Sequence, residues 1–335
     1  MVTKQQRARS SWRQMMTSLD DGKQKCRTSS SLQTLNPLPL VSICVPTYNG
    51  MGHLEEALAS IESQAYPNLE VVFSDDGSTD GTMERILRYA EASRFEVRVL
   101  RHRHTSLAGN WNNCVANAKG SYIKFLFQDD LMQPNCISSM MELALRDPEI
   151  ALVFSPREIV FEGVKDEASP AWKIAQSCAV LHAGWSDLRD IQDGVALLAD
   201  PCLLHGVWNK VGEPSIVLLQ RQALVDVGGF DPNLCQLIDL DMWYRLMTAG
   251  KVGFVDEPLS SFRIHDKQLS VDNAHSGKAR NDNMLFAKKV VHSPFFHILH
   301  PFSKKRFLKA SRPPSAFKVQ RRRLKRWLAK RVLGR

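Results

Sequence analysis

Three short apolar segments lie between residues 41 and 130, namely VSICV (residues 41–45), LEVVF (69–73) and YIKFLF (122–127). Each segment is followed closely by polar residues: PTYN (46–49), DDGS (75–78) and QDD (128–130). Short apolar runs bounded by turn-forming residues are typical of buried strands. We therefore expect three strands that each end in a polar cluster.

Helical patterns separate these strands. In residues 52–63, for example, Leu54, Leu58 and Ile61 recur at the spacing of one helix face. The same alternation predicts strands at residues 41–45, 69–73, 96–100, 122–127 and 150–154, and helices at 52–63, 80–90, 107–118 and 134–145. Alternating helices and apolar strands favour a mostly parallel sheet that helices cover on both faces.

The second half of the chain is less regular at first. Residues 156–212 show one helical pattern, at 188–199. Regular patterning then returns, with expected strands at 215–219, 252–255 and 259–264 and expected helices at 221–225 and 239–249.

The three polar clusters share one edge of the expected sheet. Ligands of such sheets bind outside the carboxyl ends of the strands, and each cluster follows a strand at that end. Aspartate oxygens are suitable ligands for a hard divalent cation. The sequence therefore predicts a site for a nucleotide and a metal ion, and hence a nucleotide-activated substrate.

The positive charge of the chain is concentrated at its end. The whole sequence carries a formal charge of +9, and residues 303–335 contain 14 Lys and Arg and no Asp or Glu, so the preceding residues carry −5. A helical projection of residues 316–332 gathers apolar residues on one face, namely Phe317, Leu324, Trp327, Leu328 and Val332. Three interpretations stay open: a helix in an anionic membrane interface, a solvated helix packed on the rest of the protein, and a nucleic-acid-binding tail, which lacks groove-reading motifs.

Composition also indicates the compartment. Seven cysteines without CxxC spacing argue against a zinc ribbon and against a secreted disulfide framework. Residues 1–27 contain no apolar run of the length that a signal peptide needs, and no uncharged apolar stretch of about 18 residues occurs. We expect a cytoplasmic protein, with peripheral attachment to the inner face of the plasma membrane as a further expectation.

Two common nucleotide-binding motifs are missing. The sequence has neither a P-loop nor a GxGxxG fingerprint, because Gly77, Gly81 and Gly109 do not have phosphate-loop spacing. An NTPase or a dehydrogenase is therefore not expected.

Six motifs in a set order carry a resemblance to a known family: PTYN (46–49), DDGSTDGT (75–82), FLFQDD (125–130), GEPS (212–215), VGGFD (227–231) and DLDMW (239–243). In this order the sequence resembles the family-2 glycosyltransferases over residues 40–270. The resemblance implies a glycosyltransferase-A fold, with a Rossmann-like, mostly parallel sheet flanked by helices. It also implies inverting transfer of a sugar from a nucleoside-diphosphate sugar to a glycan or lipid-linked acceptor, in cell-surface polysaccharide biosynthesis. The alternative is a catalytically weak protein of this fold that acts as a scaffold or binds nucleic acid through its basic tail.

The expected domains follow the same match. Residues 1–38 are expected to form a flexible basic extension, residues 39–275 the catalytic domain, and residues 276–335 a basic helical extension. Within the catalytic domain, residues 39–135 are expected to bind the nucleotide and residues 136–275 the acceptor.

The resemblance assigns the metal to Asp129. A departing nucleoside diphosphate needs its charge neutralised, which Mn²⁺ or Mg²⁺ does as a Lewis acid. Asp129 matches the last position of the family's Asp-x-Asp motif, whereas the first position is Phe127 here. His265 resembles a position that in some relatives helps to hold the metal or the diphosphate. The alternatives are that Asp129 and Asp130 cap the following helix and that His265 is an ordinary surface or core residue.

The resemblance assigns the nucleotide to the ends of the first two strands. Asp76 is expected to accept a hydrogen bond from a ring N–H of the nucleobase, while Tyr48 offers a ring for the base to pack on. Pro46, Asn49 and Asp75 complete the expected nucleotide-binding set, although Asp75 either assists binding or only caps the following turn. The Asp-Asp-Gly-Ser sequence is also an ordinary turn sequence.

Catalysis is expected to depend on Asp239. In one-step inversion the acceptor hydroxyl loses a proton as it attacks the anomeric carbon, which requires a general base. Asp239 matches the family's base position at the start of a helix, although Ile238 replaces the Glu that often precedes it. The alternative role of Asp239 is a helix N-cap, and Asp241 is expected to be structural. Glu213 and Trp208 are expected on the acceptor side, where Trp208 either stacks on a sugar ring or belongs to the core.

Overall fold

The computed structural model describes residues 37–163, 172, 181–265 and 278–313. The chain divides into two compact units, Met1–Leu38 and Pro39–Arg335, and the described residues belong to the second unit apart from Pro37 and Leu38. The amphipathic helix expected at residues 316–332 lies outside the described residues, as do residues 1–36 of the expected N-terminal extension.

Strands and helices alternate through the first part of the second unit. In chain order the elements are β1 (Val41–Thr47), α2 (Leu54–Glu62), β2 (Leu69–Asp75), α3 (Thr82–Ala92), β3 (Glu96–Arg101), α4 (Leu107–Asn117), β4 (Tyr122–Phe125), β5 (Leu131–Met132), α5 (Cys136–Ala144), β6 (Ile150–Phe154), β7 (Arg157–Phe161), η1 (His182–Gly184), β8 (Ile191–Asp193), α7 (Gly194–Ala199), η2 (Pro214–Ile216), β9 (Val217–Gln220), α8 (Arg221–Asp226), α9 (Ile238–Met247), β10 (Lys251–Phe254), β11 (Ser260–Ile264), α11 (Lys278–His292), η3 (Pro294–His297) and α12 (Pro301–Ala310).

An eight-stranded sheet forms the centre of the fold, with the strand order β3-β2-β1-β4-β9-β6-β10-β8. β1 runs parallel to β2 and β4, with Val41 opposite both Leu69 and Tyr122. β9 is antiparallel to its neighbours β4 and β6, so β6 and its parallel partner β10 again run in the direction of β1. The carboxyl ends of β1, β2, β4, β6 and β10 therefore lie at one edge, and the expected mostly parallel sheet flanked by helices is confirmed.

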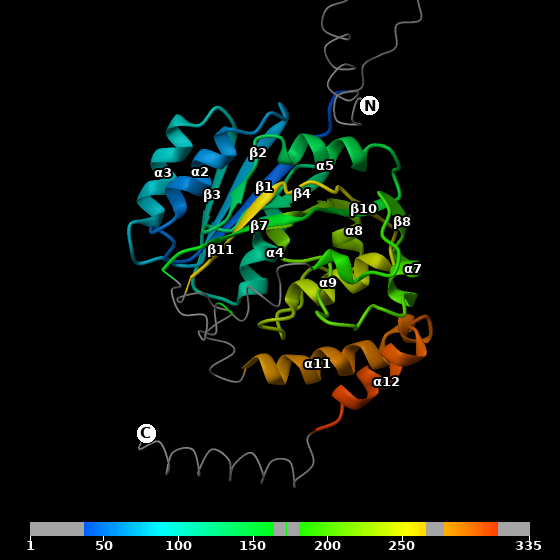
Figure 1. Ribbon diagram of the computed structural model, residues 1–335. Helices are drawn as coiled ribbons and strands as arrows, with labels where there is room; N and C mark the ends of the chain where they lie inside the picture. Colours follow the sequence, from blue (N-terminus) through cyan, green and yellow to red (C-terminus); the bar gives the residue numbers. More distant parts are fainter. Residues whose placement is uncertain (1–36, 164–171, 173–180, 266–277, 314–335) are drawn as a thin grey trace, which may run out of the picture. The chain divides into compact units, whose positions relative to one another are not determined.

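Alternate residues of the central strands face opposite layers of helices. Ile43 and Phe73 belong to the hydrophobic cluster that includes residues of α2, α3 and α5, whereas Cys44 and Val72 belong to the cluster that includes residues of α4, α7, α8 and α9. Figure 1 shows helices on both sides of the sheet. The alternation follows from the period of two in a strand. Because both faces are buried, most residues of these strands are apolar, although Ser42, Glu70 and Lys124 are also buried there.

A second sheet, with the order β5-β11-β7, is not predicted by the sequence. β11 pairs in parallel with β7, with Ser260 opposite Arg157, and antiparallel with β5, with Ser260 opposite Met132. β7 falls in the segment that the sequence describes as irregular. Its partner is about a hundred residues away in the chain, so no local pattern reports the pairing.

Helices α2, α3, α5 and α7 begin later than the sequence predicts. Residues Ile191–Asp193 form β8, which pairs with β10, and the helix expected at 188–199 is confined to α7. Asp193 marks the new start, because its side chain accepts a hydrogen bond from Val195 N at 2.8 Å and so caps α7. Likewise α5 begins at Cys136 and not at Pro134.

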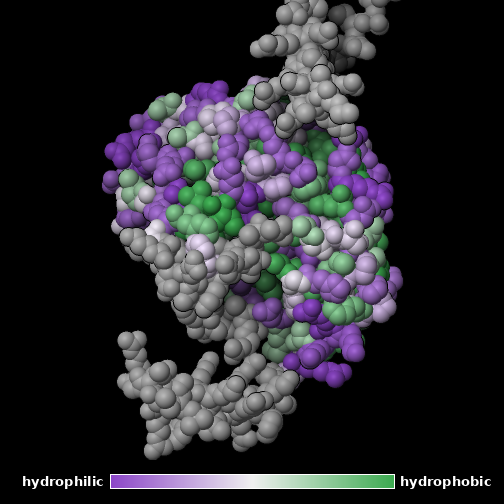
Figure 2. Space-filling model, viewed as in Figure 1, coloured by the Kyte–Doolittle hydropathy of each residue, from purple (hydrophilic) through white to green (hydrophobic). Residues whose placement is uncertain are grey.

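Helices α11 and α12 pack on the hydrophobic core of the second unit. Phe307 of α12 is fully buried, and its ring centroid lies 6.3 Å from that of Tyr244 in α9 and 5.9 Å from that of Phe286 in α11. In Figure 2 the surface over α12 is mainly hydrophilic. Among residues 37–163, 181–265 and 278–313, no helix has both the length and the apolar composition needed to cross a bilayer.

We expect Phe307→Ala to lower the free energy of unfolding by about 3–5 kcal/mol, because it removes a fully buried ring and leaves a cavity. The matched control is Leu308→Ala on the same helix, where the side chain is 40% exposed and the expected loss is under about 1 kcal/mol. Urea unfolding of the full chain measures both values. Equal losses for the two variants would mean that α12 is not part of the core.

Candidate functional site

Asp75 holds the turn that follows β2. Its buried carboxylate accepts hydrogen bonds from Thr47 Oγ1 (3.1 Å), Ser78 N (2.9 Å) and Ser78 Oγ (2.5 Å). Asn49, whose φ of +48° is uncommon outside glycine, donates its backbone N–H to Ser78 Oγ and accepts a hydrogen bond from Thr79 N, both at 2.9 Å. These two side chains shape the loops after β1 and β2, and a direct contact of either with a nucleotide stays a prediction.

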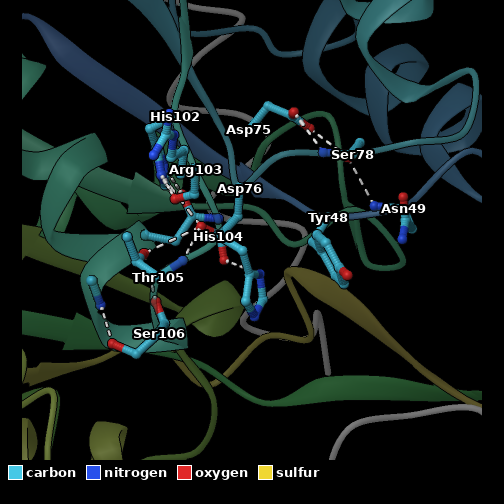
Figure 3. A network of polar contacts seen from close by, with 12 residues as sticks. Tyr48, Asn49, Asp75, Asp76, Ser78, His102, Arg103, His104, Thr105 and Ser106 are labelled. Atoms are coloured by element: carbon cyan, nitrogen blue, oxygen red, sulfur yellow. Dashed lines mark hydrogen bonds and ion pairs between the residues drawn. The ribbon is translucent and has the colours of Figure 1, made fainter.

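Asp76 is enclosed by the loop that follows β3 (Figure 3). Its Oδ1 accepts hydrogen bonds from Thr105 N (2.7 Å) and Thr105 Oγ1 (3.2 Å). Two imidazoles complete the surroundings: His102 Nδ1 lies 3.3 Å from Oδ1 and His104 Nδ1 lies 2.9 Å from Oδ2. The loop can approach this closely because Gly77, at a φ of +82°, has no Cβ; a Cβ there would lie 3.3 Å from His102 O.

Tyr48 presents its ring at the surface beside this loop. The residue is 47% exposed, and its ring centroid lies 4.8 Å from that of His104. The side-chain amide of Gln128, in the loop after β4, holds the backbone of Tyr48. Tyr48 N donates to Gln128 Oε1 (3.0 Å), and Gln128 Nε2 donates to Tyr48 O (3.2 Å). The loops after β1 and β4 are therefore tied together. Pro46 lies within β1, opposite Ser74, since the strand continues beyond its expected end at residue 45.

Asp129 and His265 converge from two elements. Asp129 follows β4 and His265 follows β11, and Asp129 Oδ2 lies 3.4 Å from His265 Nε2. Their side chains are 26% and 18% exposed, so a cation from solvent can reach them. Arg263 Nε donates to Asp129 O at 3.1 Å and fixes the backbone there.

A carboxylate beside an imidazole is a suitable ligand pair for Mn²⁺ and, through the carboxylate, for Mg²⁺. The described part of the chain holds no group of three or more His, Cys, Asp or Glu arranged to bind a metal ion. Asp129 and His265 therefore offer a partial ligand set that a diphosphate and water can complete.

Asp130 faces inward. It is 1% exposed; Oδ2 accepts a hydrogen bond from Ser215 Oγ (2.6 Å) and Oδ1 accepts one from Arg263 N (3.2 Å). Burial, followed by the charge of Asp129, raises the pKa of Asp130 well above its usual value. Neither Asp caps α5, whose N-cap position is Asn135. Asp130 instead joins the loop after β4 to η2 and β11.

Asp239 lies in the first turn of α9. Asn209 Nδ2 donates to its Oδ2 (2.8 Å), and Leu240 N donates to its Oδ1 (2.7 Å). The N-cap position is Leu237, so Asp239 does not have the alternative role of N-cap. Burial, with a smaller contribution from the charge of Glu213, raises the pKa of Asp239 to about 7. A carboxylate with this pKa can accept a proton near neutral pH.

Other acidic residues around α9 form ion pairs. Asp241 pairs with Arg245 and with Lys289 of α11, at 2.7 Å in both cases. Glu213 pairs with Arg157 in the interior, where burial raises the pKa of Glu213 even though the Arg157 guanidinium lowers it. Glu213 is thus held in an ion pair with Arg157, while its charge still contributes to the raised pKa of Asp239.

Trp208 contacts α12. Its ring centroid lies 5.7 Å from that of Phe307, and the Arg306 guanidinium lies 5.8 Å from the Trp208 ring. The ring therefore packs against the core, and its expected contact with an acceptor stays a prediction.

A cavity of about 390 Å³ opens at the carboxyl ends of β6 and β10. Trp185, Leu188 and Phe254 form apolar walls, and Arg157, His182 and Asp256 contribute polar groups. Burial lowers the pKa of His182 to about 4, so this imidazole is neutral at pH 7. The buried indole N–H of Trp185 has no hydrogen-bond partner among the described residues. The cavity lies at the same sheet edge as Asp76 and Asp129.

The sequence analysis missed the His102–Thr105 loop, Arg263 and Asn209. A signal for the loop exists, because the histidine-rich run RHRHTS follows an expected strand at the sheet edge where the other clusters lie. Arg263 and Asn209 reach Asp129 and Asp239 across 134 and 30 residues of chain. No local pattern indicates such contacts.

Residues 42–181 match the sequence family described as Glycosyl transferase family 2. The chain is 34% identical to an uncharacterized protein of Mycobacterium tuberculosis, over 69% of this chain and 70% of the relative. It is 28% identical to an uncharacterized glycosyltransferase of Rickettsia typhi, over 69% of this chain and 66% of the relative. It is 31% identical to the chondroitin synthase of Pasteurella multocida, over 73% of this chain but 22% of that protein.

Two solved structures have a similar fold. TarS of S. aureus (residues 1–349) in complex with UDP-GlcNAc superposes with a TM-score of 0.57 and 15% identity, over 77% of this chain and 69% of that one. The mannosyltransferase PcManGT of Pyrobaculum calidifontis in complex with GDP-Man and Mn²⁺ gives a TM-score of 0.55 and 19% identity, over 87% and 80%. These likenesses concern the fold, and they agree with the expected glycosyltransferase-A architecture.

Proposed function

The chain belongs to glycosyl transferase family 2, and we propose that it transfers a sugar with inversion. The donor is a nucleoside-diphosphate sugar, the acceptor is a glycan or a lipid-linked glycan, and a divalent cation assists the transfer. The observation that best supports this proposal is that two pairs of side chains meet at one edge of the sheet. These pairs are Tyr48 with Asp76 and Asp129 with His265. The alternative of a catalytically weak scaffold or nucleic-acid binder is not favoured, because relatives are named as glycosyltransferases.

Donor binding is proposed to use the ends of β1 and β2. Tyr48 has an exposed ring on which a base can stack, and Asp76 has a carboxylate that can accept a ring N–H. Uracil, thymine and guanine carry such an N–H, whereas neutral cytosine and adenine do not. The similar folds bound to UDP-GlcNAc and GDP-Man support donors of this class.

Asp129 and His265 are proposed to hold the cation. When bound, the cation supplies Lewis-acid neutralisation of the departing diphosphate. Arg263 supports the site by holding the backbone of Asp129. The similar fold that contains Mn²⁺ supports this choice of metal.

Asp239 is proposed to act as the general base. As the acceptor hydroxyl oxygen forms its bond to the anomeric carbon, its proton passes to Asp239 and the bond from that carbon to the phosphate oxygen breaks. Asn209 donates to one oxygen of Asp239 and so orients the carboxylate. Its pKa of about 7 suits proton acceptance at neutral pH.

The cavity beside Trp185 is proposed to receive a sugar ring of the acceptor. Aromatic walls suit the C–H face of a pyranose. The buried indole N–H of Trp185, which has no partner among the described residues, can donate to a hydroxyl once the side chain turns toward the cavity. Arg157 in the cavity wall pairs with Glu213, whose charge acts on Asp239. The 31% identity to a chondroitin synthase supports a glycan acceptor. A place in cell-surface polysaccharide biosynthesis, and membrane association through residues 316–332, belong to the same proposal.

Calorimetric binding of UDP, GDP and dTDP with and without Mn²⁺ tests the donor and cation sites. We expect one nucleotide to bind in a metal-dependent way, and Asp129→Ala to weaken that binding about tenfold or more, since a carboxylate is lost from a site with few protein ligands. Asp187→Ala, which removes an exposed carboxylate 63% open to solvent, is the control. Absence of binding by all three nucleotides would contradict the proposed function.

The pKa of Asp239 predicts the pH dependence of transfer. A general base must be deprotonated, so kcat/KM is expected to level off above pH 7 and to fall about fivefold from pH 7 to pH 6, then about tenfold per unit. Asn209→Ala removes a hydrogen bond that lowers the pKa of Asp239. The midpoint of the pH profile of kcat/KM is therefore expected to shift to higher pH in this variant. A flat profile between pH 5 and pH 8 would exclude Asp239 as the base.

Trp185→Phe tests the acceptor cavity, because it keeps an aromatic ring but removes the indole N–H. We expect KM for an aryl monosaccharide acceptor to rise about three- to tenfold with KM for the donor unchanged, which is the usual effect of losing one hydrogen bond. Trp208→Phe is the matched control variant, because the Trp208 ring packs against Phe307 of α12. A larger rise in acceptor KM for Trp208→Phe than for Trp185→Phe would mean that the acceptor binds beside Trp208 and not in the cavity.

A further inference from the structure

We propose that the His104 imidazole occupies the place of the nucleobase in this structure and leaves it when the donor binds, which makes His104 a determinant of donor affinity. The inference rests on the proposed function, in which Tyr48 and Asp76 receive the base. It adds a residue that competes with the donor for both of them.

The contacts of His104 are those that a base would make. Its ring faces Tyr48 at a centroid distance of 4.8 Å with an interplanar angle of 43°. Its Nδ1 lies 2.9 Å from Asp76 Oδ2, the distance of a good N–H···O hydrogen bond. A flat ring that packs against Tyr48 at a tilt and lies within hydrogen-bonding distance of Asp76 therefore already fills the site (Figure 3).

The other oxygen of Asp76 cannot serve the base instead. Oδ1 accepts two hydrogen bonds from Thr105, at 2.7 and 3.2 Å, and lies 3.3 Å from His102 Nδ1. The side chain of Asp76 is 5% exposed, and Oδ2 has His104 as its one polar partner among the described residues. A nucleobase that donates to Asp76 must therefore displace His104.

His104 can move, whereas His102 cannot. The side chain of His104 is 62% exposed, and Asp76 is its one polar partner among the described residues. The side chain of His102 is 22% exposed and has further contacts with Arg103 O, Ser74 Oγ and Asn110 Oδ1 at 2.9, 3.0 and 3.3 Å. A rotation of the His104 side chain, with the loop backbone left in place, is enough to open the site.

The test is calorimetric binding of UDP, GDP and dTDP with Mn²⁺ to the wild type and to His104→Ala. For the nucleotide that the wild type binds, we expect His104→Ala to bind about three- to tenfold more tightly, which corresponds to ~0.7–1.4 kcal/mol. KM for the donor is expected to fall by a similar factor with kcat unchanged. His104→Phe, which keeps a ring but has no N–H for Asp76, is expected to lie between the wild type and His104→Ala.

Two controls test whether His104 competes with the nucleobase and with no other part of the nucleotide. Binding of inorganic pyrophosphate with Mn²⁺ is expected to be the same in the wild type and in His104→Ala, because His104 competes with the base and not with the phosphates. His297→Ala, which removes an exposed imidazole of η3, is expected to leave nucleotide binding unchanged.

Weaker or equal nucleotide binding by His104→Ala would overturn the inference, since weaker binding would mean that the base lies between His104 and Tyr48 as a third ring. That failure differs from failure of the proposed function. If the wild type binds a nucleotide and Asp76→Ala loses it, the proposed donor site stands whatever His104→Ala does; if the wild type binds none, the proposed function itself fails.

Discussion

The buried carboxylate of Asp130 holds the two halves of the catalytic unit together. It accepts hydrogen bonds from Ser215 and from the backbone of Arg263, which lie 85 and 133 residues further along the chain. Lys124, itself fully buried, donates to the carbonyl of Ser215. Burying a polar group without partners costs several kcal/mol, so η2, β11 and the loop after β4 must be in place together. The pairing of Asp129 with His265 depends on this arrangement, because both flank the residues that Asp130 joins.

Five aspartates in and around the site fall into two groups by their environment. Asp75, Asp130 and Asp241 are buried and hydrogen-bonded within the protein, and they hold backbone and helices in position. Asp129 and Asp239 are partly exposed, so part of their hydrogen-bonding capacity remains for a ligand. A carboxylate that is saturated by the protein stabilises the fold, whereas one with free capacity can bind a cation or accept a proton. Adjacent residues in one motif, such as Asp129 and Asp130, thus have different roles.

Sequence patterns predicted most of the first half of the fold. The expected strand at 150–154 coincides with β6, and the expected helix at 107–118 differs from α4 by one residue. Both have strong local patterns. The strands β5, β7 and β8 were missed because they lack a buried apolar run: β5 has two residues, and β7 and β8 contain no fully buried residue. Helices α11 and α12 were not located individually, since the basic composition of that region hides the few apolar residues that pack on α9.

Local patterns predicted the mostly parallel sheet, its covered faces, the family and the edge at which the polar clusters gather, because periodicity and motif order can be recognised in a single chain. The three-dimensional structure was needed to show which carboxylates are buried and which remain open to solvent. It also showed that His104 lies 2.9 Å from Asp76, that Trp208 packs on α12 and that Trp185 lines a cavity. Burial and long-range pairing arise when distant segments meet. No single segment contains that information.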